Sequence, residues 1–290
     1  MKPFTIIIII LLLLTALAAF SQKTDKQLQR HLMQMIEGFH GDIGFYVQNL
    51  KNGKVAAFNA DTVFPTASIV KVPILVGVMH KIEMGELKYH QKLVYKDSLL
   101  YAGKDILGSF KNGETIELSK VMMLMLTISD NTASLWLQSL AGTGTRINEL
   151  MDSLGLPDTR VNSRTPGREE AQRRYQWGQT TPRQMATLFK LIGEGKVISL
   201  QASANMLQRL GRNYWDEEAL STIPPGVFVA SKNGAVDASR SEVMWVNAKK
   251  TPYLFAVFTK NNTDKSWTPN NEAWTLTRNL SQFVWKYFNN

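Results

Sequence analysis

The sequence predicts an α/β fold of the α+β type, a five-stranded antiparallel sheet built by both ends of the chain with a helical block inserted between them. Three observations predict this. Two short apolar runs flank an Asn-Gly pair near the N-terminus, and three runs rich in Val, Phe, Tyr and Trp lie near the C-terminus. The stretch between them carries apolar residues at helical spacing. This order of elements fits one sheet formed by the two chain ends.

Composition limits the classes of function. Of 290 residues, 44% are hydrophobic and 20% are charged, which is typical of a soluble globular protein. The chain contains no cysteine, which excludes thiol catalysis, disulfides and cysteine-based metal sites. A formal charge of +9 favours approach to anionic surfaces, although solubility explains it as well. Because no Lys/Arg block is interleaved with aromatic residues, we expect no nucleic-acid partner.

Residues 1–21 have the pattern of a secretory signal peptide. Lys2 supplies the positive start, and an unbroken run of Ile and Leu from Ile6 to Leu14 precedes small residues. The apolar run is short for a membrane span of about 20 residues. We therefore expect cleavage after Ser21 or Ala18, with no stable membrane insertion afterwards. A retained membrane anchor is the alternative. The protein is predicted to be exported, to a periplasm or to the medium.

The first elements after this segment are a helix and a hairpin. Apolar residues spaced i, i+4, i+7 and i+8 predict an amphipathic helix that Gly38 ends, on the face of Leu28, Leu32, Met35 and Ile36. Two apolar-rich runs, 43–50 and 55–58, flank Asn52-Gly53. Asn-Gly between such runs is a strong hairpin signal.

The middle of the chain, about 63–204, is predicted to be helical. Four segments have the required spacing: Val121–Ile128, Asn131–Leu140, Ile147–Leu154 and Met185–Ile192. The last follows Thr180-Thr181-Pro182, a favourable helix start. Residues 162–179 are polar and Arg-rich with almost no periodicity, so we expect a long surface loop there. Long loops of this kind are usually functional or disordered.

The C-terminal part returns to strands. Val227–Ser231, Glu242–Asn247 and Tyr253–Thr259 are rich in residues that favour strands. A final amphipathic helix follows on the face of Leu276, Leu280, Phe283, Val284 and Tyr287. We expect residues 22–290 to form a single domain, with the sheet in about 22–62 and 205–290.

The first chemical motif is Ser68-Ile69-Val70-Lys71. If a helix begins near Ser68, positions i and i+3 share a face, so the hydroxyl lies beside the amine at the positive end of the helix dipole. A neutral lysine can take the serine proton and make the serine a nucleophile. Neutrality requires a pKa lowered by burial or by a nearby cation. A capping serine with a surface lysine is the alternative interpretation.

Two further motifs follow. Ser129-Asp130-Asn131 comes directly after the apolar run 121–128 and predicts a turn between two helices at the edge of the core. Simple helix capping is the alternative, since Ser, Asp and Asn are favoured N-cap residues. Lys232-Asn233-Gly234 stands at the end of the expected strand 227–231, where a strand-end turn would explain it equally well.

Taken together, the three motifs resemble a known signature. S-x-x-K, S-D-N and K-T-G mark the class A β-lactamases and penicillin-binding proteins, and here the three motifs occur in that order with compatible spacing. Thr180-Thr181-Pro182 before a helix and Ser239-Arg240 after the third motif add to the resemblance. It covers nearly the whole chain after residue 21. It implies a β-lactamase-like fold with an Ω-like loop over about 162–180, no cofactor and no metal.

The resemblance also implies residue roles. Ser68 attacks the carbonyl of a β-lactam or of a D-Ala-D-Ala peptide, Lys71 activates it, and Ser129 relays a proton to the leaving nitrogen. The implied substrate-binding groups are Asn131 for the side-chain amide, Lys232 and Arg240 for the carboxylate, Asn233 and Gly234 of the third motif, and Ala235, whose N–H joins that of Ser68 as an oxyanion hole. The histidines all lie in the first third of the chain, which disfavours a Ser-His-Asp hydrolase.

Two positions depart from the family pattern. Asn233 stands where Thr or Ser is usual, which places the substrate preference in question. The Ω-loop glutamate that activates the hydrolytic water in class A enzymes would fall near Thr165, where there is no carboxylate. Glu169 and Glu170, four and five residues later, are the candidate bases, with a solvated charge network as the alternative for both.

Three functions therefore remain open. The first is an exported class A-like β-lactamase. The second is a penicillin-binding protein or D,D-peptidase that acylates but deacylates slowly, which the missing Ω-loop glutamate favours. The third is a non-catalytic wall-binding or sensor module, which Asn233 and the positive charge favour. The expected partner is a small β-lactam or a peptidoglycan-stem-like substrate, and a monomer is the family-like default.

Overall fold

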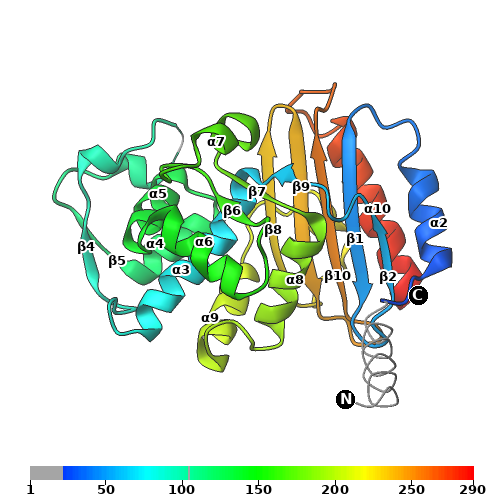
Figure 1. The fold of residues 1–290 in the computed structure, drawn as a ribbon, viewed down its shortest axis with the longest axis horizontal. Helices are drawn as coiled ribbons and strands as arrows, with labels where there is room; N and C mark the ends of the chain where they lie inside the picture. Colours follow the sequence, from blue (N-terminus) through cyan, green and yellow to red (C-terminus); the bar gives the residue numbers. More distant parts are fainter. Residues whose placement is uncertain (1–21, 104) are drawn as a thin grey trace, which may run out of the picture.

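The computed structural model describes residues 22–103 and 105–290 (Figure 1). The predicted signal peptide at 1–21 lies outside the described residues. The two ends of the chain contribute strands to one sheet, and the middle of the chain forms a helical block. The sheet and the block lie side by side (Figure 1). Within the described ranges, no helix is both long and apolar enough to cross a lipid bilayer.

The sheet confirms the predicted architecture. Its strand order is β2-β1-β10-β9-β8, and all its pairings are antiparallel. The strands are β1 (Asp42–Asn49), β2 (Val55–Phe58), β8 (Val229–Val236), β9 (Ser239–Val246) and β10 (Tyr253–Lys260). Asn52-Gly53 lies in the turn between β1 and β2, where Gly53 has a φ of +72° that glycine adopts without strain. The two chain ends thus supply neighbouring strands of one sheet.

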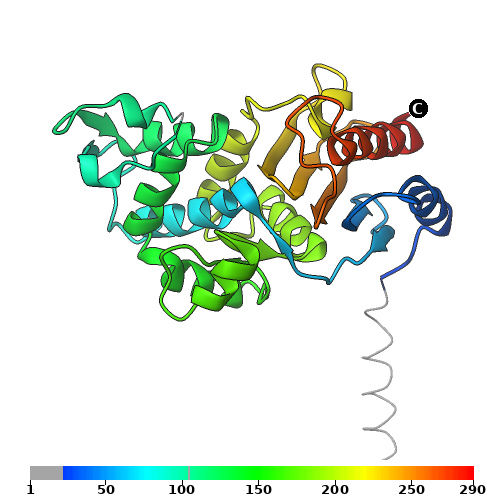
Figure 2. The ribbon, with the colours of Figure 1, turned by 90° about the horizontal axis from the view of Figure 1, so that it is seen from above.

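The two faces of the sheet bury different layers. Alternation along β1 sends Phe45 and Val47 toward α2 (Lys26–Met35) and α10 (Glu272–Asn289), and Tyr46 toward the opposite core. Figure 2 shows α2 and α10 on one side of the sheet and the helical block on the other. α8 (Pro182–Gly193) packs on that second face. Its N-cap is Thr181, as the Thr-Thr-Pro start predicts.

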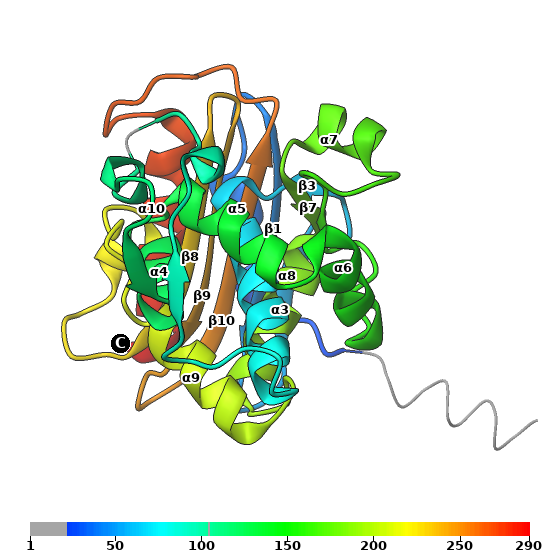
Figure 3. The same ribbon diagram turned by 90° about the vertical axis from the view of Figure 1, so that its left-hand side faces the viewer.

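The helical block surrounds one central helix, α3 (Lys71–Glu83), whose first nine residues are all buried. A helix that is apolar on every side is a core helix. Around it lie α4 (Leu118–Thr127), α5 (Asn131–Leu140), α6 (Thr143–Ser153) and α9 (Leu200–Leu210), in the view of Figure 3. Two short strands, β4 (Lys92–Val94) and β5 (Thr115–Glu117), pair antiparallel, and the long connection 95–114 lies between them. Sequence reasoning did not identify α9 or this strand pair.

The structure corrects the expected surface loop over 162–179. This segment contains α7 (Glu169–Tyr175) and enters β7 (Gly178–Thr180), which pairs with β3 (Phe64–Pro65) and β6 (Arg160–Val161). Its first residues, Asn162, Ser163 and Thr165, are buried. The Arg168 guanidinium donates to Asn162 Oδ1 and Gln179 Oε1 and so ties the two ends of the segment together. Because hydrogen bonds between polar side chains hold this segment in place, its sequence has no apolar periodicity from which the helix and the strand could be predicted.

The third motif also lies elsewhere than predicted. Lys232-Asn233-Gly234 is part of β8, which continues to Val236, and the turn falls at Asp237-Ala238. The pairings Lys232↔Val243 and Gly234↔Ser241 continue the ladder with β9. The strand therefore carries the motif along the edge of the sheet that faces the helical block.

Candidate active site

The three sequence motifs meet at one cavity between β8 and the helical block. The cavity has a volume of about 540 Å³. Ser68, Ser129 and Asn131 line it from the helical side, and Asn233, Gly234 and Ala235 line it from the sheet. We call it the Ser68 cavity. The remaining walls are Asp105, Ile128, Trp215, Glu217, Glu218, Trp267, Pro269 and Trp274.

Ser68 lies in a short 3₁₀ turn, η1 (Ala67–Val70), which leads into α3. The turn is entered through Ala67 at a φ of +43°, and the N–H of Ile69 donates to the Thr66 carbonyl at 2.9 Å. This tight entry puts the serine hydroxyl at the start of the buried helix. The prediction that Ser68 and Lys71 share a face is met, because the Lys71 amine donates to Ser68 Oγ at 3.1 Å.

Lys71 lies buried behind the cavity wall and connects the residues that line it. Its side chain is completely buried, and its amine also donates to the carbonyl and hydroxyl of Ser129 at 2.5 and 2.9 Å and to Asn131 Oδ1 at 2.8 Å. One amine thus connects the first motif with the second. Burial, and then the positive charge of Lys232, hold the pKa of Lys71 well below its ordinary value, while Asp105 and Asp130 act in the opposite direction. The lowered pKa favours the neutral form of the amine, which is the form that can accept a proton.

The second motif forms the turn between α4 and α5, as predicted. Ser129 adopts a φ of +62°, an uncommon conformation for a residue with a side chain. Asp130 is the N-cap of α5, and its carboxylate accepts from the N–H of Ala133 at 2.7 Å and from the N–H of Leu107 at 3.0 Å. Burial raises the pKa of Asp130. Within this triplet, Asp130 therefore caps the helix and fixes the turn, whereas Ser129 and Asn131 line the cavity.

Lys232 is a second fully buried amine. It donates to the carbonyl of Asn233 at 2.9 Å and to Asn233 Oδ1 at 3.2 Å. Burial lowers the pKa of Lys232 to about 7, against an opposing effect of the Glu242 carboxyl. The Asn233 amide oxygen thus faces Lys232 at the position where the family usually carries a hydroxyl.

Gly234 brings the sheet into contact with the nucleophile. A Cβ at this position would lie 2.5 Å from the Thr66 carbonyl oxygen and 2.9 Å from the Ser68 nitrogen. Real side chains do not approach backbone atoms so closely, so only glycine allows β8 to pack on η1 at this point. The requirement for Gly234 is steric.

The register of β8 orients the N–H of Ala235. The N–H of Asn247 donates to the Phe228 carbonyl, so Phe228 belongs to a hydrogen-bonded pair of the antiparallel ladder. Hydrogen-bonded pairs alternate along such a ladder, and Ala235 therefore belongs to a row whose N–H groups point away from β9. That direction is the open edge beside Ser68. The two groups predicted as an oxyanion hole line the same cavity.

Arg240 lies behind the cavity wall. Its buried guanidinium lies against both Trp267 and Trp274, with its central carbon 4.4 and 4.7 Å from the two ring centroids, and the two indoles meet edge to face 5.8 Å apart. It donates to the carbonyls of Ser239 and Ser266 at 3.1 and 3.0 Å. The two indoles line the Ser68 cavity, whereas the guanidinium does not. The predicted contact between Arg240 and a substrate carboxylate stays a prediction, and two tryptophans stand at the cavity wall beside this arginine.

The candidate deacylation bases lie apart from Ser68. Glu169 and Glu170 are exposed residues of the first turn of α7, and neither lines the cavity. Hydrogen bonds from the N–H groups of Glu169 itself and of Gly167 lower the pKa of Glu169. Thr165, at the position expected for the family glutamate, is buried with its hydroxyl 1.8 Å from the site of a Cβ on Gly144. The side chain of Thr165 is therefore packed on α6.

Sequence reasoning missed several residues of the cavity. Asp105 accepts from the N–H of Thr132 at 2.8 Å, which ties the loop before η3 (Leu107–Ser109) to the start of α5. Trp215 and Trp267 are large aromatic residues with 46% and 59% of their surface exposed at the cavity rim. In the sequence, a large aromatic residue within an otherwise polar segment was the signal that could have identified Trp215 and Trp267. Within residues 22–103 and 105–290, no group of His, Asp and Glu is arranged to hold a metal ion.

The arrangement as a whole supplies a nucleophile, a base and a proton relay. Ser68 presents its hydroxyl to an amine with a lowered pKa, and the same amine contacts the Ser129 hydroxyl. Lys232 adds positive charge beside them. Such a site suits transfer of an acyl group from an anionic substrate to serine.

Comparison with known proteins identifies relatives along nearly the whole chain. The profile of the family described as "Beta-lactamase enzyme family" matches residues 25–288. The β-lactamase SME-1 of Serratia marcescens is 22% identical over 281 residues, which cover 91% of this chain and 92% of the relative. The β-lactamase CARB-3 of Pseudomonas aeruginosa is 21% identical over 251 residues, with 85% and 86% covered.

Solved structures share the fold. PBP-A superposes with a TM-score of 0.81 at 25% identity, over 92% of this chain and 97% of that protein. A mutant of PBP-A, solved as an acyl-enzyme complex with penicillin G, superposes equally well, over 92% and 98% of the two chains. A β-lactamase from Chitinophaga pinensis has a TM-score of 0.80 at 19% identity, over 91% of this chain and all of that chain.

Proposed function

The chain belongs to the Beta-lactamase enzyme family, among relatives that are class A serine β-lactamases, and on that premise we propose that it opens β-lactam rings through an acyl-enzyme on Ser68. The observation that carries the proposal is the position of the Lys71 amine. It lies within hydrogen-bonding distance of both the Ser68 and the Ser129 hydroxyls, and these two serines line a cavity large enough for a small amide.

In the proposed acylation, Ser68 Oγ bonds to the β-lactam carbonyl carbon while its proton passes to the neutral amine of Lys71. The N–H groups of Ser68 and Ala235 stabilise the oxyanion that forms, and removing one such donor typically costs about 10²–10³ in rate. The ring C–N bond then breaks. Its nitrogen receives the proton from Lys71 through Ser129, so every proton released is returned to the product. Lys232 attracts the substrate carboxylate when its amine is charged.

The hydrolytic half of a β-lactamase cycle needs a base for water. Neither Glu169 nor Glu170 contacts Ser68 or Lys71 in the described part of the chain, and Thr165 carries no carboxylate. This observation favours a second candidate function. The protein would then acylate with penicillin but release the product slowly, as a penicillin-binding protein or D,D-peptidase does.

One experiment separates these functions. The protein is incubated with excess penicillin G, and intact mass and hydrolysed drug are followed together, with Ser68→Ala and the exposed Ser139→Ala as matched variants. A transient adduct with accumulating hydrolysed drug supports the β-lactamase. A persistent adduct with little hydrolysis supports the penicillin-binding protein. Absence of both would contradict acylation at Ser68 and favour the non-catalytic wall-binding module. Labelling that persists in Ser68→Ala would also contradict acylation at Ser68 and would assign the adduct to another residue.

We further propose that residues 1–21 direct export and are removed, so that residues 22–290 work as one domain outside the cytoplasm. The exported setting would bring the protein into contact with β-lactams and cell-wall peptides. N-terminal sequencing of the mature protein from its host tests this proposal, with a start at Gln22 or Ala19 expected.

A further inference from the structure

The cavity proposed to hold an anionic substrate is itself lined by three carboxylates, Asp105, Glu217 and Glu218. Asp105 is half-buried, and it accepts from the N–H and the hydroxyl of Thr132 at 2.8 and 3.2 Å. Glu217 is exposed to solvent. Glu218 is the buried member of the three, with 8% of its surface exposed. Because water and salt screen a buried charge less than an exposed one, an unpaired charge on Glu218 would repel the carboxylate of a substrate.

Arg278 of α10 supplies the opposite charge from behind the cavity wall. Its guanidinium donates to Glu218 Oε2 at 2.8 Å. Burial raises the pKa of Glu218, and the positive charge of Arg278 acts against that rise, whereas the neighbouring Glu217 adds to it. Arg278 does not line the Ser68 cavity. Its effect on a substrate must therefore pass through the residues that it holds.

The same guanidinium also holds a second part of the cavity wall. Its other terminal nitrogen donates to the carbonyl of Pro269 and to Thr275 Oγ1, the latter at 3.0 Å. Glu218 and Pro269 come from different segments of the chain, and both line the cavity. Because a guanidinium is a rigid fork, Arg278 fixes the Glu218 carboxylate relative to Pro269.

The wall segment that carries Glu218 is also attached to the helical block by other contacts. The N–H of Tyr214 donates to the Thr127 carbonyl at 2.9 Å, and the indole N–H of Trp215 donates to the Ile128 carbonyl at 2.9 Å. These bonds do not involve Arg278. The position of this segment therefore does not depend on the arginine alone.

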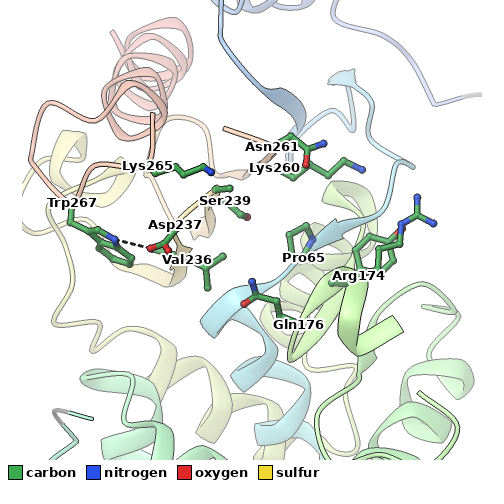
Figure 4. Close-up of a pocket in the computed structure, with 13 residues that line it drawn as sticks. Pro65, Arg174, Gln176, Val236, Asp237, Ser239, Lys260, Asn261, Lys265 and Trp267 are labelled. Carbon is green, nitrogen blue, oxygen red and sulfur yellow. Dashed lines mark hydrogen bonds between the residues drawn. The ribbon is translucent and has the colours of Figure 1, made fainter. Parts of the chain in front are cut away.

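The wall segment that carries Pro269 is attached to the sheet in the same independent way. The indole N–H of Trp267 donates to Asp237 Oδ1 at 3.0 Å, which is the dashed line in Figure 4. The Ser266 carbonyl accepts from Arg240 at 3.0 Å and from Asn271 Nδ2 at 3.1 Å. With both segments attached elsewhere, loss of Arg278 should leave the wall in place and change mainly the charge that Glu218 presents to the cavity.

We propose that Arg278 is a positioning residue for the Ser68 cavity, which neutralises Glu218 and holds its carboxylate beside Pro269 so that the cavity accepts an anionic substrate. The inference rests on the proposed acylation of Ser68 and deepens it, because it identifies a residue outside the three motifs that sets the affinity for the substrate. Arg278 acts on binding and takes no part in the proton transfers of Lys71 and Ser129.

The test follows acylation by penicillin G over a range of drug concentrations, by intact mass after acid quench. This separates the apparent dissociation constant of the drug from the limiting rate of acylation. In Arg278→Gln we expect the dissociation constant to rise about five-fold at low ionic strength and the rise to shrink at high salt, with the limiting rate within about two-fold. The double variant Glu218→Gln, Arg278→Gln removes both charges and should restore the affinity, and Arg278→Lys keeps the charge and should retain it.

Rates are compared at a temperature where all variants are folded, because breaking a buried ion pair destabilises a protein. Arg183→Gln is the matched control, since Arg183 of α8 pairs with Asp61 at 2.7 Å and does not line the cavity. It removes one positive charge and one ion pair and should leave the dissociation constant unchanged.

An unchanged dissociation constant in Arg278→Gln would overturn this inference alone. So would a loss of affinity that persists in the double variant, a loss that Arg183→Gln reproduces, or an effect confined to the limiting rate. Absence of any adduct in the unmodified protein would overturn the proposed function and this inference with it.

Discussion

The Lys71 amine lies 2.9 Å from the Ser129 hydroxyl, although 58 positions separate the two residues in the chain. It also lies 2.5 Å from the Ser129 carbonyl, whose residue has a positive φ. The buried amine therefore serves chemistry and structure together, since it faces the nucleophile and holds the relay serine in place. Both functions depend on the same atom.

Replacing Lys71 with Met should remove the base while filling the same buried volume. We expect acylation by penicillin G to slow by about 10²–10⁴, the usual contribution of general acid–base catalysis. The melting temperature should fall as well, because the Ser129 carbonyl and Asn131 Oδ1 lose their donor, so the rate is compared at a temperature where both proteins are folded. Stopped reactions analysed by intact mass measure the rate, with Lys81→Met on the same helix as the control. A rate within a few-fold of the unmodified protein would contradict the role of Lys71.

The pH dependence of acylation should report both buried amines. Rates should rise with pH as Lys71 loses its proton, at a pH well below the ordinary lysine value. They should fall again above about pH 7, because the charge of Lys232 is lost through that range. Lys232→Arg keeps its charge throughout and should lack the descending limb. A descending limb of the same position in Lys232→Arg would assign it to another group.

Gly234→Ala should damage both stability and acylation. The added Cβ would meet backbone atoms of Thr66, Ser68 and Ile69 within 2.5 to 3.1 Å, and backbone cannot move aside as a side chain can. We expect a loss of about 1–3 kcal/mol of unfolding free energy, the usual cost of overpacking. Urea denaturation measures it. Gly103→Ala, which adds a Cβ to open space, should be nearly neutral, and equal losses in both variants would contradict the steric explanation.

Glu169→Gln and Glu170→Gln test whether either carboxylate activates water. Both side chains are exposed and lie outside the Ser68 cavity, and the lowered pKa of Glu169 makes it a weaker base. We therefore expect the lifetime of the penicillin adduct to change by less than about two-fold, because a general base works best with a pKa near the working pH. Accumulation of adduct in one variant alone would instead identify the base and require that α7 move toward Ser68.

Stability should fall as pH rises through the titration of Glu242. This buried carboxyl accepts from the N–H groups of Ala219 and Leu220, and burial raises its pKa to about 8. Between about 4.5 and 8 the folded state binds more protons than the unfolded state, so the unfolding free energy declines across that window. One group contributes a slope of at most about 1.4 kcal/mol per pH unit. Urea denaturation at several pH values should show this slope, and Glu242→Gln should reduce it.

The local part of the site could be predicted because its spacing lies within single elements. Ser68 and Lys71 are three residues apart on one helical turn, and Asp130 caps the helix it precedes. The hairpin, the strands and the first and last helices followed from periods of two and 3.6 residues. The segment 162–179 could not be predicted in this way, because Arg168, Asn162 and Gln179 hold it by polar contacts that leave no apolar period.

By itself, the sequence determined the sheet formed by both chain ends, the three motifs and their order. Only the tertiary structure decided that Lys71 reaches Ser129, that Arg240 stacks behind Trp267 and Trp274, and that Glu169 and Glu170 face solvent. The physical reason is the distance along the chain over which each kind of interaction acts. Helical and strand periods act over a few residues, whereas contacts between distant segments depend on how all the elements pack together.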